Sequence, residues 1–148
     1  MIEKLCRYRK SYKKQILFRF TIGSKDNEVL NFGEPYAPSY EERIKCLEYA
    51  HDKGYKVSVS IEPMLDPDNI GDLLNDLPAI EMESVWIGKM NHTSRIAVRG
   101  SEELRAEIID LERAQSDDNI LNIYHDWKHE TKIRWKDSVQ KVIDKSVN

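Results

Sequence analysis

The stretch EPYAPSYEERIKCLEYAHDKGYKVSVSIEPM, residues 34–64, decides the fold. Ser39 followed three residues later by Glu42 forms a capping box, which marks the start of a helix. Apolar residues at helical spacing follow, and Gly54 supplies the left-handed residue that commonly ends a helix. The run KVSVSI then predicts a strand over residues 56–61. A helix joined this closely to a strand normally packs on one face of a parallel sheet.

The predicted strand has two different faces. Apolar residues alternate with polar ones along it, and the polar ones are Ser58, Ser60 and, just past its end, Glu62. A buried parallel strand is normally apolar on both faces. The polar face therefore needs an explanation, and a ligand, a partner chain or solvent would each provide one.

The remaining elements are read from the same kinds of pattern. The sequence predicts strands over 15–22 and 84–90, helices over 2–13, 67–77, 101–114, 118–127 and 135–143, a long loop over 25–38 and a short extended piece over 96–98. Asp66 is the expected cap of the helix at 67, and Asp117 or Asp118 that of the helix at 118.

This order of elements predicts an α/β fold. We expect a partial parallel (β/α) barrel of about three strands with right-handed crossover helices over residues 1–91. A helical C-terminal extension over residues 92–148 is expected to pack on it within a single domain. Three strands leave two unpaired edges and one uncovered face, so either the C-terminal helices or another chain must cover that face.

Composition excludes some classes of function. The net charge of −3 and the pI of about 5.8 give no drive toward nucleic acid. No apolar run reaches the roughly 20 residues of a membrane helix, and the N-terminal sequence has no signal-peptide core. Cys6 and Cys46 are predicted to be reduced thiols of a cytoplasmic protein. The basic face expected on the first helix (Arg7, Arg9, Lys10, Lys13 and Lys14) is interpreted as solvated.

The polar residues of the three predicted strands form one candidate site. Ligands of open α/β sheets bind beyond the carboxyl ends of the strands. The residues expected there are Thr21, Ser24, Glu62, Lys89 and Asn91, with Arg19, Ser58 and Ser60 on the sheet face behind them. The alternative is a sheet face left to solvent, and Glu62 before Pro63 alternatively pins a loop or caps a helix.

Other chemical motifs are weak. His125 and His129 lie one helical turn apart, as in zinc proteases, but the glutamate that follows the first histidine there is Asp126 here. We therefore predict no metal site. His92 lies after the third strand, where an exposed loop histidine is expected. Glycine-rich phosphate loops and the nucleophile elbow are absent from the sequence.

Three segments resemble a known family. The segments ILFRFTIGS, EPYAPSYEERIKCLEYAHDKGYKVSVSIEPML and VWIGKMN look like the C-terminal half of radical S-adenosylmethionine (SAM) proteins similar to spore photoproduct lyase. The family pattern is a strand, an E-P-x-x-P-S/T-x-x-E-R helix start, a G-Y or G-F stop, and a strand ending near E-P. The resemblance covers roughly residues 10–91, and the tail IRWKDSVQKVI matches more weakly.

The resemblance implies a partial barrel whose strand ends contact SAM. Thr21 and Ser24 would lie near the ribose, and Glu62, Lys89 and Asn91 would end the next two strands. Ser60 would also face the cofactor, whereas Arg19 and Ser58 would face substrate. In the family, a CxxxCxxC loop in the first half ligates a 4Fe–4S cluster. This sequence has two distant cysteines and no such loop, so no residue here is predicted to be catalytic.

Two main hypotheses follow. In the first, the chain lines the SAM and substrate side of a barrel without radical chemistry of its own. A cluster-bearing N-terminal half, on a separate chain or a missing segment, or a second copy would then be its partner. In the second, it is a self-contained non-enzymatic α/β domain that acts through a homodimer or a partner. A hydrolase or metal enzyme built on Glu62, Lys89 and the histidines is less favoured, because no nucleophile or ligand set converges.

Overall fold

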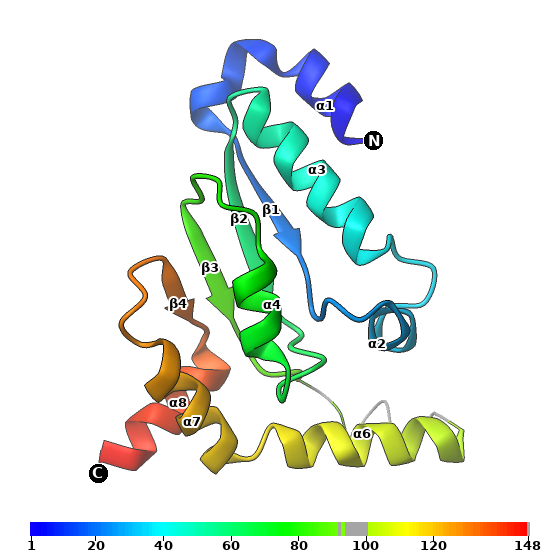
Figure 1. The fold of residues 1–148 in the computed structure, drawn as a ribbon, viewed down its shortest axis with the longest axis vertical. Coiled ribbons are helices and arrows are strands. Elements are labelled where there is room, and N and C mark those ends of the chain that lie inside the picture. Colours follow the sequence, from blue (N-terminus) through cyan, green and yellow to red (C-terminus); the bar gives the residue numbers. More distant parts are fainter. Residues whose placement is uncertain (92, 94–100, 148) are drawn as a thin grey trace.

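The structure is a computed structural model that describes residues 1–91, 93 and 101–147. It has a mixed α/β fold built on one four-stranded parallel sheet (Figure 1). The strands are β1 (Leu17–Thr21), β2 (Lys56–Ile61), β3 (Ser84–Ile87) and β4 (Ile133–Trp135). The helices are α1 (Ile2–Tyr8), the short 3-10 helix η1 (Lys10–Gln15), α2 (Asn27–Gly33), α3 (Tyr40–Asp52), α4 (Ile70–Asp76), α6 (Glu102–Ala114), α7 (Asp117–Trp127) and α8 (Asp137–Val147).

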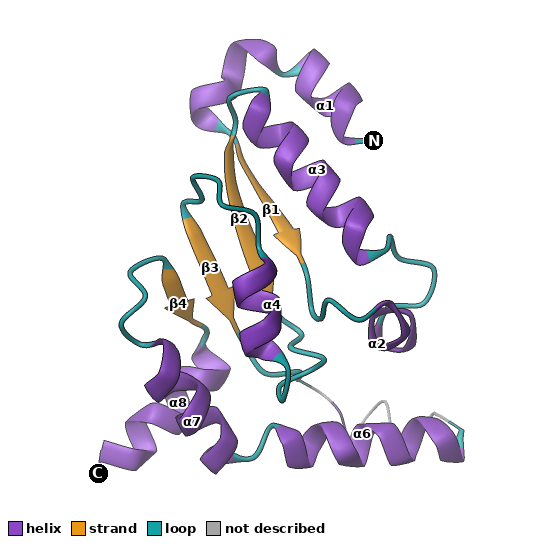
Figure 2. Ribbon diagram, viewed as in Figure 1, coloured by secondary structure: helices purple, strands orange, loops and turns teal. Residues whose placement is uncertain are grey.

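The strands lie in the sheet in the order in which they occur in the chain, β1-β2-β3-β4. Each pair of neighbours is parallel, so each connection must cross over the sheet. Helix α3 makes the first crossover, α4 the second, and α6 with α7 the third. Figure 2 shows α3 and α4 over the same face of the sheet. The prediction of an α/β fold with a parallel sheet is confirmed.

The core lies between that sheet face and the helices. Val57, Val59 and Ile61 of β2 are fully buried, as are Leu47 and Ala50 of α3. The same cluster includes apolar residues of the other strands and of α4, α7 and α8 (Phe18, Phe20, Val85, Ile87, Ile133, Ile70, Leu73, Ile120, Ile123, Val139 and Val142). Burial of this apolar face drives the docking of the helices on the sheet.

The three predicted strands are present, and the predicted strand count was wrong. The fourth strand, β4, lies in the region predicted to be helical, and Trp135 belongs to it rather than to the last helix. Its pairing partners in β3 are Val85 for Ile133 and Ile87 for Trp135. Three residues are too short a run to show strand alternation, so pairing with β3 decides their conformation. The last helix then starts at Asp137.

Two helix predictions also need correction. Residues 25–38 are not all loop, because Asp26 caps the seven-residue helix α2 by accepting a hydrogen bond from the Glu28 amide. Asp66 does not cap the next helix, which starts at Ile70 after Asn69.

The other helix predictions are closer to the structure. Ser116, not Asp117 or Asp118, caps α7. The capping box of α3 forms as predicted between Ser39 and Glu42. His92 and the extended piece predicted at 96–98 lie outside the described residues.

The sequence block that carries the family resemblance has a structural role. Arg43 of α3 is buried and forms an ion pair with Glu34 at 2.6 Å. The same guanidinium donates to the carbonyl oxygens of Pro38, at 2.8 Å, and Thr21, at 2.9 Å. One side chain thus ties the end of β1 to the loop that enters α3.

Candidate functional site

Polar side chains occupy the sheet face opposite the core. In one row across the strands, Arg19 lies beside Ser58 and Ser58 beside Ser84. In the next row, Thr21 lies beside Ser60, Ser60 beside Trp86 and Trp86 beside Arg134. Arg19, Thr21 and Arg134 are exposed, so this face meets solvent at both outer strands.

Arg19 contacts both Trp86 and Ser58 on this face. The Arg19 guanidinium lies 5.3 Å from the centre of the Trp86 ring, a cation–π contact. Arg19 Nε donates to the Ser58 hydroxyl at 3.3 Å, and that hydroxyl donates to the Ser84 carbonyl oxygen at 2.9 Å. Ser58, on the face opposite the core, is 0% exposed. The indole Nε1 of Trp86 is buried without a hydrogen-bond partner in the described part of the chain.

A second cation reaches Trp86 from the end of β4. The Lys136 ammonium lies 5.5 Å from the centre of the indole and 2.9 Å from a Glu62 carboxylate oxygen. Gly88 makes room for this ion pair, because a Cβ atom there would lie 2.7 Å from Glu62 Oε1 and 2.9 Å from Lys136 Cγ. The ion pair thus joins the chain beyond β2 to the chain beyond β4, across β3.

A cavity of about 400 Å³ opens beside this ion pair. Its lining combines cations, carboxylates and one aromatic ring, and consists of Glu62, Trp86, Asn91, Lys136, Asp137, Ser138 and Lys141. The cavity lies beyond the carboxyl ends of β2, β3 and β4, where open α/β sheets bind their ligands. A polar molecule of mixed charge matches this lining.

The structure brings six of the eight predicted site residues to one side of the sheet. Arg19, Thr21, Ser58 and Ser60 lie on the polar face, and Glu62 and Asn91 line the cavity at its end.

The other two predicted residues are engaged elsewhere. Ser24 is buried, where its hydroxyl donates to Asp66 at 3.3 Å and accepts from the Asp26 amide at 2.9 Å. The Lys89 ammonium lies 3.6 Å from Asp117 at the start of α7. Ser24 thus links the loop after β1 to the loop after β2, and Lys89 links the chain after β3 to the start of α7.

Sequence reasoning missed Trp86, Ser84, Arg134 and Lys136. Trp86 and Ser84 have the parity of the polar face within a predicted strand, and that signal was available. Arg134 and Lys136 lie in and just after β4, so their positions depend on a strand too short to predict.

Within the described ranges, no group of three histidine, cysteine or acidic side chains is arranged to hold a metal ion. His125 and His129 are exposed, and the His125 ring contacts Lys128 at 3.1 Å. Cys6 and Cys46 are free thiols on different helices, and burial raises the pKa of Cys6. Two separate thiols do not fit a cluster that needs three local thiolates.

None of the described helices is long and apolar enough to cross a membrane. The chain is 26% identical over 127 residues to the uncharacterized protein ORF301 of Acidianus two-tailed virus. The match covers 77% of this chain and 42% of the viral protein, so the chain spans less than half of that relative's length. No family model matches the chain. No solved structure matches it either.

Proposed function

We propose that this chain is part of the wall of a parallel (β/α) barrel, and that its polar sheet face lines a ligand site completed by another segment. The observation that carries the proposal is that the two faces of the sheet differ in chemical character. Core residues and helices lie on one face, whereas Arg19, Ser58, Ser60 and Trp86 lie on the other. In a (β/α) barrel the helices cover the outer face of the strands and the other face lines the interior, so the polar face of this sheet would be the interior one.

The free sheet edges support the same proposal. Among the described residues, strands β1 and β4 each have one neighbouring strand, so the outer side of each presents backbone groups without a strand partner there. Closing a barrel pairs such edges. The segment that closes it belongs to another chain or to another part of a longer chain. The viral relative has room for such a segment, because the match covers 42% of its length.

The resemblance to radical SAM proteins supplies the ligand class, S-adenosylmethionine. SAM carries a carboxylate, an ammonium, a sulfonium and an adenine ring. The cavity at the end of the polar face offers Lys136 and Lys141 to the carboxylate and Glu62 to the cations. Because Cys6 and Cys46 do not supply a cluster site, the chain would bind this ligand without radical chemistry of its own.

Fluorescence of Trp86 tests ligand binding directly. Replacing Trp127 and Trp135 with phenylalanine leaves Trp86 as the sole indole of the sequence. We expect SAM to change its emission with saturation, and Lys136→Met to weaken the affinity several-fold. Lys132→Met is the matched control, since Lys132 is exposed and lies outside that cavity. Calorimetric titration of the unmodified chain provides a second readout, and no heat and no fluorescence change at millimolar SAM would contradict the proposed ligand.

A self-contained domain is the second candidate. The observation that favours it is that Ser58, Ser60 and Ser84 of the polar face are already buried, with Ser58 hydrogen-bonded to the chain's own Arg19. Such a domain needs no covering segment. The two candidates differ at the outer edge of β1: a segment that completes the barrel would protect the Arg19 and Thr21 amides against hydrogen exchange, whereas a self-contained domain leaves them unprotected.

A further inference from the structure

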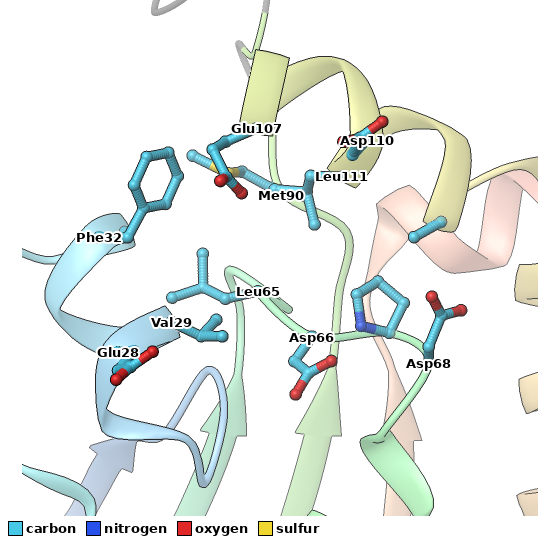
Figure 3. Close-up of a pocket in the computed structure, with 13 residues that line it drawn as sticks. Glu28, Val29, Phe32, Leu65, Asp66, Asp68, Met90, Glu107, Asp110 and Leu111 are labelled. Carbon is cyan, nitrogen blue, oxygen red and sulfur yellow. The ribbon is translucent and has the colours of Figure 1, made fainter. Parts of the chain in front are cut away.

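A second cavity lies away from the polar sheet face. It has a volume of about 370 Å³ and is bounded by α2, the loops that follow β2 and β3, and α6 (Figure 3). Its apolar lining comes from Val29, Phe32, Leu65, Met90 and Leu111. Phe32 remains 39% exposed, so part of this apolar surface is not covered by the residues that the structure describes.

Carboxylates surround the apolar lining. The lining contains no basic residue in the described part of the chain. Five acidic side chains line the cavity: Glu28, Asp66, Asp68, Glu107 and Asp110. Neutral groups donate to two of them, Ser24 and Asn69 to Asp66 and Asn119 to Asp68. These hydrogen bonds leave the negative charge in place. Such a groove favours a segment that combines apolar and cationic side chains.

The opposite end of the molecule presents that chemistry. Residues 1–15 contain six basic residues and one acidic residue, MIEKLCRYRKSYKKQ. The same segment exposes four large apolar side chains: Met1 at 99%, Leu5 at 43%, Tyr8 at 78% and Tyr12 at 50%. Helix α1 of this segment packs on α3 and its Cys6 is buried, so the exposed residues belong to the outer side of a docked element.

Residues 1–15 cannot reach the acidic groove of their own copy. Helix α1 and helix α6 lie at opposite ends of the molecule (Figure 1). The segment would therefore have to come from a second copy, and the contact would join two different surfaces. A contact of that kind is heterologous and builds rings or open chains rather than an isologous dimer.

We propose that residues 1–15 of one copy dock into the acidic groove of another, with Tyr8 or Leu5 against the apolar lining and the basic residues against the carboxylates. This surface is separate from the polar sheet face, so the inference goes beyond the proposed function and does not depend on it.

A charge swap tests the contact. Glu28→Lys with Glu107→Lys reverses two carboxylates in the groove, and Arg7→Glu with Lys10→Glu reverses two exposed cations of the segment. Sedimentation velocity at low salt measures association of each protein. We expect the native chain to associate with increasing concentration and to dissociate as salt rises, because exposed charges are screened.

Each double variant alone should be at least tenfold weaker in association than the native chain. An equimolar mixture of the two should associate again, since native and swapped surfaces then both meet opposite charges. Glu48→Lys, at an exposed position of α3, is the matched control and should leave association unchanged. A native chain that stays monomeric at low salt would overturn the proposal, and the groove would then belong to a different cationic partner. Association that survives either double variant, or that the mixture fails to restore, would overturn it too.

Discussion

The Lys136 ammonium and the Glu62 carboxylate, 2.9 Å apart, meet over the backbone of Gly88. This ion pair spans from the end of β2 to the end of β4 because the residue between them has no side chain. Both side chains are about three-quarters buried, with exposures of 27% and 28%. The same two residues line the cavity at the carboxyl end of the sheet. The ion pair therefore sets the shape and charge of the candidate ligand site.

Gly88→Ala should abolish the coupling between these two residues. The new methyl group would displace both partners, since it would lie 2.7 Å from Glu62 Oε1 and 2.9 Å from Lys136 Cγ. A double-mutant cycle with Glu62→Gln and Lys136→Met should give a coupling free energy of about 0.5–1 kcal/mol in the native background. The same cycle in the Gly88→Ala background should give a value near zero, and an unchanged coupling would show that the pair does not depend on Gly88.

Arg43→Lys should destabilise the chain strongly. Lysine keeps the charge but cannot reach the three acceptors that the Arg43 guanidinium satisfies, on Glu34, Pro38 and Thr21. We expect a loss of about 2–4 kcal/mol in the free energy of unfolding, measured by urea denaturation. Arg113→Lys is the control, because Arg113 is 77% exposed and should change stability by less than about 0.5 kcal/mol. Equal effects of the two substitutions would refute the role given to Arg43.

The contact between Tyr40 and Asp76 should make stability depend on pH. The Tyr40 hydroxyl donates to the Asp76 carboxylate at 2.8 Å and joins α3 to the end of α4. This hydrogen bond, helped by Lys25, lowers the pKa of Asp76, whereas burial and then the Asp76 hydrogen bond raise the pKa of Tyr40.

The sign of the pH dependence follows from these two shifts. A lowered carboxyl pKa contributes stability above the pKa of Asp76 in the unfolded chain, and that contribution is lost as pH falls through the folded pKa. A raised phenol pKa contributes below the unfolded pKa of tyrosine and is lost as pH rises through the folded value. Tyr40→Phe should therefore be less stable than the native chain between these limits. The difference in urea midpoint should shrink in acid, and a constant difference down to pH 2 would contradict this explanation.

Ser58→Ala should cost about 1–2 kcal/mol despite the small change in volume. The hydroxyl of Ser58 links Arg19 to the Ser84 carbonyl oxygen, and its loss leaves a buried acceptor with fewer donors. Thr21→Ala is the comparison on the same face, since Thr21 is exposed. Thermal unfolding of the two variants measures both effects, and a Ser58 effect no larger than that of Thr21 would show that the hydrogen-bonded link contributes little.

Much of the fold was predictable from local pattern. The capping box at Ser39 and the stop at Gly54 fix α3, and the alternation after it fixes β2. These signals are complete within a few residues, so tertiary contacts do not overrule them. The shared face of Arg19, Thr21, Ser58 and Ser60 follows from strand parity alone, and Glu62 continues the parity of β2 just past its end.

The rest depended on contacts distant in sequence. Strand β4 has three residues, and its conformation comes from pairing with β3 more than 40 residues earlier in the chain. Lys136 could not be placed in the site without that strand. The engagement of Ser24 with Asp66 is another such case, because the two residues are 42 positions apart. The alternation of residues in the strands shows which face is polar, but not which of the predicted site residues already have hydrogen-bond or ion-pair partners.

Amide hydrogen exchange along β1 tests the open sheet edge most directly. The Ile22 amide donates to the Ser60 carbonyl oxygen at 2.9 Å. The alternation of a parallel strand then directs the Phe20 amide toward β2 and the Arg19 and Thr21 amides toward the open edge. In the monomeric chain, we predict slow exchange at Phe20 and exchange at least a hundredfold faster at Arg19 and Thr21. If the Arg19 and Thr21 amides of the monomer are protected as strongly as the Phe20 amide, the edge of β1 is not open, and the account is contradicted.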